Sequence, residues 1–163
     1  MPQELESKVA VSLDVTALDL GALDGVTAEV LETMFFTEAT ATSCDHEWFD
    51  TAVGARVEFE GTHCGSVCLR VSGDAARSMA AGFLGLDEAE LTDTQINQIL
   101  LELANIFCGA AMSRLWPDSS LSLAPPEPMD PRAVPDSDGH RCYSLPDGML
   151  AVTVSLRGDG SRE

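Results

Sequence analysis

TDTQINQILLELANIFCGAAMSRLW, residues 92–116, is the stretch that decides the fold. Thr92 and Gln95 have the spacing of a capping box, in which each side chain accepts a hydrogen bond from the other residue's backbone N–H. Pro117 prevents continuation beyond about Trp116, because proline lacks a backbone N–H and its ring clashes with the preceding turn. The sequence therefore predicts one long helix here, the longest element of the chain.

This helix carries a broad apolar arc and a narrower polar arc when it is wound at 100° per residue. The apolar arc, which we expect to face the core, contains Ile96, Ile99, Leu100, Leu103, Ala104, Ile106, Phe107, Ala110 and Ala111. The polar arc spans roughly 100° by the same geometry. We expect it to face solvent, and it holds Gln95, Gln98, Glu102, Asn105, Gly109 and Ser113.

Glu102 and Asn105 form the most informative pair on the polar arc. They are three residues apart, so their Cβ atoms lie about 5–6 Å from one another and both side chains can enter one partner pocket. Asparagine is a mediocre helix former, which favours a functional role for Asn105 over an idle one. The alternative is that both are ordinary polar residues on a solvated helix face.

Local patterns predict several elements upstream of this helix. Residues 9–20 alternate loosely and suggest a strand or an irregular segment. A helix is expected from Thr27, a candidate N-cap, because apolar residues follow at helical spacing over residues 30–35. The stretches VGARVEFEG (53–61) and CGSVCLRVS (64–72) alternate with a period of two, which predicts an antiparallel hairpin.

The remaining elements flank the long helix on both sides. Asp74 opens the stretch DAARSMAAGFLGL, which predicts a second helix with glycines near its end. Residues 117–140 are rich in proline, so we expect an extended or irregular crossing segment. Residues 142–158 read as a second hairpin that turns at Pro146, Asp147 and Gly148, and residues 157–163 as a frayed tail.

This order of elements predicts the α/β (α+β) class, a mostly antiparallel sheet with helices packed on one face. We expect a single domain over residues 1–163, with its core at about 26–156. VLETMFF (30–36) resembles LLELANIF (100–107), since each places a glutamate inside an apolar helix. This echo predicts a pseudo-two-fold domain in which the first and the long helix pack side by side on one face.

The composition excludes several classes of function. Hydrophobic residues make up 45% of the 163 residues and charged residues 22%, as in ordinary globular proteins. Twenty-seven acidic against nine basic residues give a formal charge of −18, so we expect no nucleic-acid partner. No apolar run approaches the roughly 18 residues of a membrane span, and the N-terminus lacks a hydrophobic signal core. We therefore expect a cytoplasmic protein with no membrane partner.

Five cysteines, an odd number without a paired spacing, favour a reduced compartment. Five potential zinc ligands lie within a short stretch of chain: Cys44, His46, His63, Cys64 and Cys68. Cys64 and Cys68 share a predicted strand, where residues four apart are about 13 Å apart and cannot hold one ion. We expect buried small hydrophobes and no metal site.

LELANIFCGAA resembles the signature helix of the CheC, CheX and FliY family of chemotaxis phosphatases. The family pattern is a glutamate, two residues, an asparagine, a spacer of 22 residues and a proline, which Glu102, Asn105 and Pro128 match. Gly109 also fits the family, in which a small residue lets a neighbouring element approach the helix. The order of elements agrees with the family from about Val26 to Leu156.

One departure points to a branch of this family. In CheC-like members both helices carry the Glu and Asn pair, whereas here Glu32 is followed by Phe35 in the asparagine position. The chain therefore resembles the CheX branch, which implies one active site per protomer and a homodimer. We expect the dimer to form through sheet edges, because hairpins such as 53–73 leave unpaired edges.

The resemblance implies a phosphatase that hydrolyses the aspartyl phosphate of a CheY-like response-regulator receiver, in chemotaxis or related two-component signalling. Asn105 would orient the attacking water and Glu102 would pair with the receiver's lysine, with Gln98 and Gly109 as partner-binding neighbours. We expect this chain to bind no cofactor, and Mg to be held by the partner receiver. The alternative is a non-catalytic CheX-like module that docks on a receiver or signalling partner.

Overall fold

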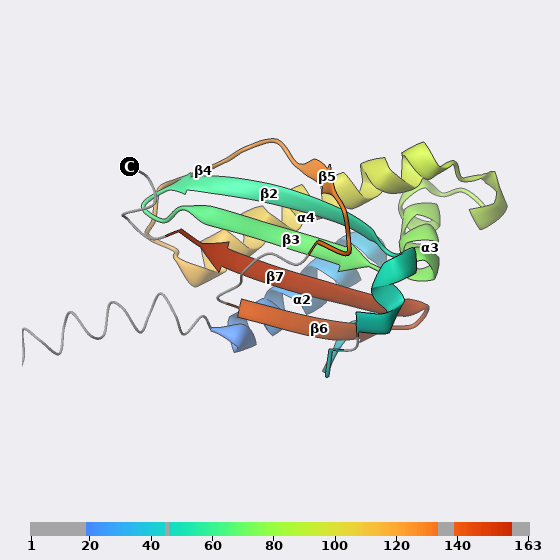
Figure 1. Cartoon of the computed structure of the whole chain (residues 1–163), viewed down its shortest axis with the longest axis horizontal. Coiled ribbons are helices and arrows are strands. Elements are labelled where there is room, and N and C mark those ends of the chain that lie inside the picture. The colour runs from blue at the N-terminus through green and yellow to red at the C-terminus, as the bar shows by residue number, and fades with distance from the viewer. Residues whose placement is uncertain (1–18, 45, 134–138, 158–163) are drawn as a thin grey trace, which may run out of the picture.

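A seven-stranded sheet is covered on one face by helices (Figure 1). The computed structural model describes residues 19–44, 46–133 and 139–157. Within these ranges the helices are α2 (Leu20–Phe35), η1 (His46–Thr51), α3 (Gly73–Leu84), η2 (Glu88–Glu90) and α4 (Asp93–Leu115). The strands are β1 (Thr40–Thr42), β2 (Val53–Gly61), β3 (Gly65–Val71), β4 (Leu121–Leu123), β5 (Glu127–Met129), β6 (Gly139–Leu145) and β7 (Gly148–Leu156).

Both predicted hairpins are present, and they meet at the centre of the sheet. The strand order is β1-β6-β7-β3-β2-β4, with β5 also on β2, and every pairing is antiparallel. A two-fold rotation that exchanges the hairpin β2-β3 with β6-β7, and the edge strand β4 with β1, leaves this order unchanged. The order thus agrees with the predicted pseudo-two-fold.

Helices α2 and α4 contact each other and lie on the same face of the sheet, which confirms their predicted placement (Figure 1). α4 begins with the predicted capping box: Thr92 Oγ1 accepts from the Gln95 N–H at 3.1 Å, and Gln95 Oε1 accepts from the Thr92 N–H at 2.9 Å. By length and composition alone α4 is also apolar enough to cross a membrane. Its apolar side, however, packs into the core of the domain.

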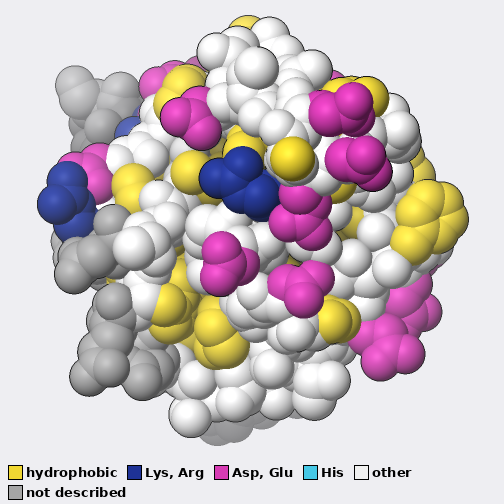
Figure 2. All heavy atoms as spheres, turned by 90° about the vertical axis from the view of Figure 1, so that its right-hand side faces the viewer, with side chains coloured by type: hydrophobic (Ala, Val, Ile, Leu, Met, Phe, Trp, Pro, Cys, Tyr) yellow, Lys and Arg dark blue, Asp and Glu magenta, His cyan; other side chains and the backbone are white. Residues whose placement is uncertain are grey.

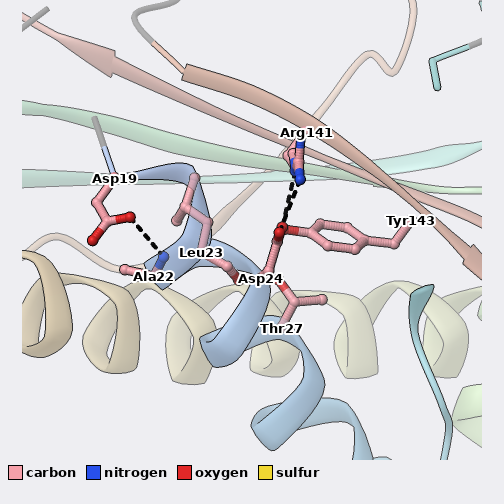
Figure 3. Close-up of polar contacts among 7 residues, drawn as sticks. All are labelled: Asp19, Ala22, Leu23, Asp24, Thr27, Arg141 and Tyr143. Carbon is pink, nitrogen blue, oxygen red and sulfur yellow. Dashed lines mark hydrogen bonds and ion pairs between the residues drawn. The ribbon is translucent and has the colours of Figure 1, made fainter. Parts of the chain in front are cut away.

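The first helix begins earlier than predicted, so the assignment of Thr27 as N-cap was wrong. Asp19 is the N-cap, and its side chain accepts a hydrogen bond from the Ala22 N–H at 3.1 Å (Figure 3). Thr27 is fully buried within the helix, where its hydroxyl donates to the Leu23 carbonyl at 2.8 Å. The helical part of the stretch 9–20 begins at Leu20, and residues 9–18 lie outside the described ranges.

An ion pair joins the first half of α2 to β6 (Figure 3). Arg141 donates two hydrogen bonds to the Asp24 carboxylate, each at 2.9 Å, and the Tyr143 hydroxyl donates a third at 2.7 Å. The hydrogen bond from Arg141 lowers the pKa of Asp24, against the opposite effect of its partial burial. Because Leu23 is also fully buried, the packed core extends upstream of Val26.

Short strands cover the edges of the long hairpins, contrary to the prediction that the hairpin 53–73 has unpaired edges. The predicted crossing segment contains β4 and β5, which both pair with β2, and β1 pairs with β6. Residues 134–138 of this segment lie outside the described ranges, as do residues 158–163 of the predicted tail. Three-residue edge strands offer little backbone for pairing with another chain.

Gly148 lies at the turn between β6 and β7, where a side chain has no room. A Cβ at this position would collide with Ser72 Oγ at the start of α3. That hydroxyl accepts a hydrogen bond from the Met149 N–H at 3.0 Å. The glycine therefore lets the turn approach α3, which follows β3 in the other hairpin.

Acidic side chains are spread over the end of the molecule that lies on the right of Figure 1 (Figure 2). This end includes α3 and the segment that follows it, in which Asp87, Glu88 and Glu90 are all exposed. Exposed apolar side chains, including Phe83 and Leu86, lie in the same region of the chain. A surface of this charge repels polyanions such as nucleic acids.

Candidate functional site

Glu102 and Asn105 lie on the solvent side of α4, as predicted. Both side chains are exposed, and within the described residues neither forms a hydrogen bond or an ion pair. On the opposite side the helix buries Ile96, Ile99, Leu100, Leu103, Ala104, Phe107, Cys108, Ala111 and Met112. Because the buried side fixes the rotation of the helix, the two polar side chains are held side by side and free to meet a partner.

Gln98 and Ser113 are exposed on the same side of α4, and Gly109 is half-buried between them. The expectation that Gly109 permits a close approach was wrong in this structure. A Cβ at Gly109 would meet only Leu123 Cδ1, at 3.9 Å, which is an ordinary van der Waals contact. The neighbouring strand β4 therefore leaves space for a methyl group.

A shallow groove separates α2 from α4 beyond Asn105. It is lined by Glu29, Val30, Thr33, Ala110, Ser113 and Arg114. Arg114 Nη2 donates to Glu29 Oε1 at 2.7 Å, so an exposed ion pair bridges the two helices at this groove. Side chains of α2 thus border the surface that carries the Glu102 and Asn105 pair.

The equivalent pair on α2 is built differently. Glu32 is exposed, whereas Phe35 is only 2% exposed and stacks on Phe83 with ring centroids 5.1 Å apart. A phenyl ring has no group that could hold a water, and this one belongs to the core. This part of α2 is thus an ordinary core-packed helix with an exposed glutamate.

Pro128, the last residue of the motif, lies in β5. Its Cα pairs in register with that of Ala55 in β2, and β5 contacts α4. Proline fits an edge strand because it has no N–H to donate to a further strand. The proline of the motif therefore lies in the sheet layer behind α4, with 22 residues between it and Asn105.

The cysteines are divided between two environments. Cys64, Cys68 and Cys108 are buried free thiols, in agreement with their interpretation as small hydrophobes. Burial raises the pKa of the Cys108 thiol to about 12, which makes it unreactive near neutral pH.

Cys44 and Cys142, by contrast, form a disulfide across 98 residues of sequence, with their Cα atoms 5.3 Å apart. The interpretation of the cysteines as unpaired was wrong for this pair. His63, which was considered with Cys44 as a zinc ligand, instead stacks on Trp116 with ring centroids 4.1 Å apart. The side chain of His46 lies outside the described part of the chain.

Sequence reasoning missed two features, the groove between α2 and α4 and, on the other face of the sheet, the association of Cys142 with Cys44. Both depend on pairs of residues far apart in the chain. The only local sign was the alternation of His140 and Cys142, which puts both on one face of a strand.

A family model described as "Chemotaxis phosphatase CheX" matches residues 53–146. A comparison with curated protein sequences finds no match. Among solved structures, the chemotaxis protein CheX from Vibrio vulnificus is similar with a TM-score of 0.69 and 15% identity, over 84% of this chain and 95% of that one.

Two further structures extend the likeness. A chain of the CheX-CheY-BeF3-Mg²⁺ complex from Borrelia burgdorferi aligns with a TM-score of 0.63 and 18% identity, over 86% of this chain and 99% of its own. FliY from Thermotoga maritima aligns with a TM-score of 0.53 and 15% identity, over 83% and 84% of the two chains. At these identities the structural likeness describes the fold.

Proposed function

Because the chain belongs to the chemotaxis phosphatase CheX family, we propose that it hydrolyses the aspartyl phosphate of a CheY-like response-regulator receiver. The observation that carries this proposal is the pair Glu102 and Asn105, both exposed on α4 and without partners among the described residues. Their spacing lets both side chains reach one site on a docked protein.

Asn105 is proposed to place the attacking water. An aspartyl phosphate is hydrolysed when a water oxygen attacks phosphorus in line with the departing carboxylate oxygen, which gives inorganic phosphate and a free carboxylate. An asparagine amide can accept a hydrogen bond from that water and donate another, and it does not titrate near neutral pH. Glutamine has the same positioning role in GTPases.

Glu102 is proposed to bind the receiver's lysine. A carboxylate and an ammonium group that leave water on docking form a charge-assisted hydrogen bond, which fixes the register of α4 on its partner. The phosphoryl charge would be held by the receiver's own metal and lysine. In this mechanism the chain positions the attacking water and fixes the docking register, and the Mg is bound by the receiver.

The complex between CheX and CheY in Borrelia burgdorferi supports the choice of partner, because the chain aligned there has the same fold. That complex contains Mg²⁺ and BeF3. Gln98 and Gly109 flank the pair on the exposed side of α4, so both are proposed as partner-binding residues.

The test is to mix the purified chain with a phosphorylated receiver of the same organism and to follow the loss of phosphate. We expect decay faster than that of the receiver alone, in proportion to the amount of chain added. Binding to the phosphorylated receiver without any acceleration would replace the proposal with a non-catalytic docking module.

The homodimer and the cytoplasmic location stay predictions. The dimer rests on the likeness to the CheX branch, since the described sheet edges are short strands. Light scattering at micromolar concentration tests it, and a monomer would contradict it.

A further inference from the structure

Strand β6 presents two different sets of side chains to the two faces of the sheet. Arg141 and Tyr143 point toward α2, where both bind Asp24 (Figure 3). Alternation along the strand puts His140 and Cys142 on the opposite face. There Cys142 packs with Phe49 of η1, away from the core beneath the helices.

Three potential metal ligands meet on that face. Cys44 follows strand β1, which pairs with β6 so that Thr42 lies opposite Cys142. The ligand atoms of Cys44, Cys142 and His140 all lie within 4.8 Å of one another. The shared strand and the β1-β6 register therefore bring together two sulfurs and an imidazole.

The separation of Cys142 from His140 suits a tetrahedral ion, whereas the two sulfurs are bonded to each other here and would move apart on reduction. Zinc binds sulfur at about 2.3 Å and histidine nitrogen at about 2.0–2.1 Å, so a tetrahedral site separates these two ligand atoms by about 3.6 Å. The measured distance from Cys142 Sγ to His140 Nε2 is 3.9 Å. The other ring nitrogen, Nδ1, lies 2.9 Å from Thr153 Oγ1. Such a contact orients an imidazole whose Nε2 serves as a metal ligand.

We propose that Cys44, Cys142 and His140 bind a zinc ion when the two cysteines are reduced. Binding converts two thiols into thiolates and releases two protons. The disulfide and the zinc site exclude each other, because the two sulfurs can bind zinc only as thiolates. Opening the disulfide takes two electrons and two protons. Two thiols supply both and become a disulfide, whereas a phosphine supplies the electrons, takes up the oxygen of a water and leaves the two protons of that water on the sulfurs. A water fills the fourth position.

The charge of this site fits its surroundings. Zn²⁺, two thiolates and a neutral imidazole sum to zero, so the ion adds no net charge beside the fully buried Arg70. Arg70 Nη2 lies 3.4 Å from the same Thr153 hydroxyl that contacts His140. The Arg70 guanidinium also lies over the Phe49 ring, at 4.0 Å from its centroid. Zinc would thus fasten the chain around Cys44 to a sheet face that already has a buried cation.

The experiment measures metal in the full chain, purified with a phosphine reductant and dialysed against metal-free buffer. We expect about one zinc per chain by mass spectrometry. Replacement of zinc by cobalt should give the visible absorption of a tetrahedral ion with sulfur ligands. Cys142→Ser and His140→Gln should each lose most of the zinc and weaken the cobalt spectrum.

Matched control variants distinguish the proposed zinc ligands from other cysteine and histidine residues. Cys64→Ser and His63→Gln change the same residue types outside the cluster and should retain the metal. The cobalt spectrum of the unaltered, reduced chain keeps the test valid if a variant fails to fold. The proposal is overturned if the reduced chain binds neither metal at micromolar concentration, or if the disulfide persists in excess reductant.

Discussion

Helices α2 and α4 pack on equivalent strands, α2 on β6 and α4 on β2, yet only α4 carries the Glu and Asn pair. On α4 the residue three positions after Glu102 is the exposed Asn105. On α2 the residue three positions after Glu32 is Phe35, which is buried and stacked on Phe83. The same position along an equivalent helix therefore faces solvent in one case and the core in the other.

This difference shows that two equivalent helices can serve different roles, one in packing and one in contacting a partner. A phenylalanine in the core contributes apolar burial that an asparagine would forfeit, so α2 gains packing at the position where α4 presents an amide. The two helices also differ in how they are held. α4 begins with a capping box, whereas α2 begins with the single cap of Asp19 and is also joined to β6 by the ion pair of Asp24 with Arg141.

The largest expected effect comes from giving α2 the asparagine. Phe35→Asn should lower the free energy of unfolding by about 3–5 kcal/mol, because it empties a core position and buries an amide. Denaturant unfolding measures it. The neighbouring Phe36→Asn is the control, since Phe36 is 81% exposed with a φ of 56°, a conformation that asparagine tolerates well. Equal losses for both variants would contradict the assignment of Phe35 to the core.

Removing the asparagine from α4 should act on turnover and leave stability nearly intact. Asn105→Ala is expected to slow receiver dephosphorylation by about 100-fold or more, since a misplaced water forfeits the positioning advantage. Receiver affinity should change little. Asn97→Ala, an exposed asparagine on the same helix, is the matched control. Full activity of Asn105→Ala would remove the catalytic hypothesis.

The ion pair between Asp24 and Arg141 should make the free energy of unfolding depend on pH. Asp24→Asn is expected to cost about 2 kcal/mol at pH 7, where the carboxylate accepts charge-assisted hydrogen bonds. Arg141 lowers the pKa of Asp24 in the folded chain, so this stabilisation is present above the unfolded value of 3.8 and is lost as the pH falls through the folded value.

Urea unfolding at pH 7 and pH 3 tests this dependence. The difference between the unaltered chain and Asp24→Asn should shrink at the lower pH. Glu32→Gln, at an exposed site on the same helix, should show no such dependence. A difference that stays constant with pH would assign the loss to packing instead of charge.

Glu102 should matter for docking more than for the chemical step. Glu102→Ala is expected to weaken binding to the phosphorylated receiver by roughly tenfold, the value of one charge-assisted contact. Titration at two salt concentrations should show a weaker salt dependence for the variant. Glu32→Ala on α2 is the control, and an equal loss there would mean that general surface charge governs docking.

The smallest effect concerns the spacing of α4 from its neighbour. Gly109→Ala should raise the free energy of unfolding by about 0.5–1 kcal/mol, because alanine is the better helix former and the site has room for its methyl group. Thermal unfolding measures this gain. A loss of stability would show that β4 approaches α4 more closely than the 3.9 Å contact suggests.

Several features of the fold followed from local sequence. The capping box at Thr92 and Gln95, the apolar arc of α4 and the turn at Gly148 each depend on residues within a few positions of one another. The start of α2 was misjudged because Thr27 can cap a helix or bind within one, and its buried hydroxyl binds the Leu23 carbonyl. Local spacing does not distinguish these two roles.

The sequence by itself determined that Glu102 and Asn105 share the exposed side of a helix, because 3.6 residues per turn and the apolar positions fix its rotation. Only the tertiary structure decided which segments meet. The pairing of β3 with β7, the burial of Phe35 beneath Phe83 and the contact of Cys44 with Cys142 join residues far apart in the chain. Strand register and packing set these contacts, and neither leaves a periodic signal within one segment.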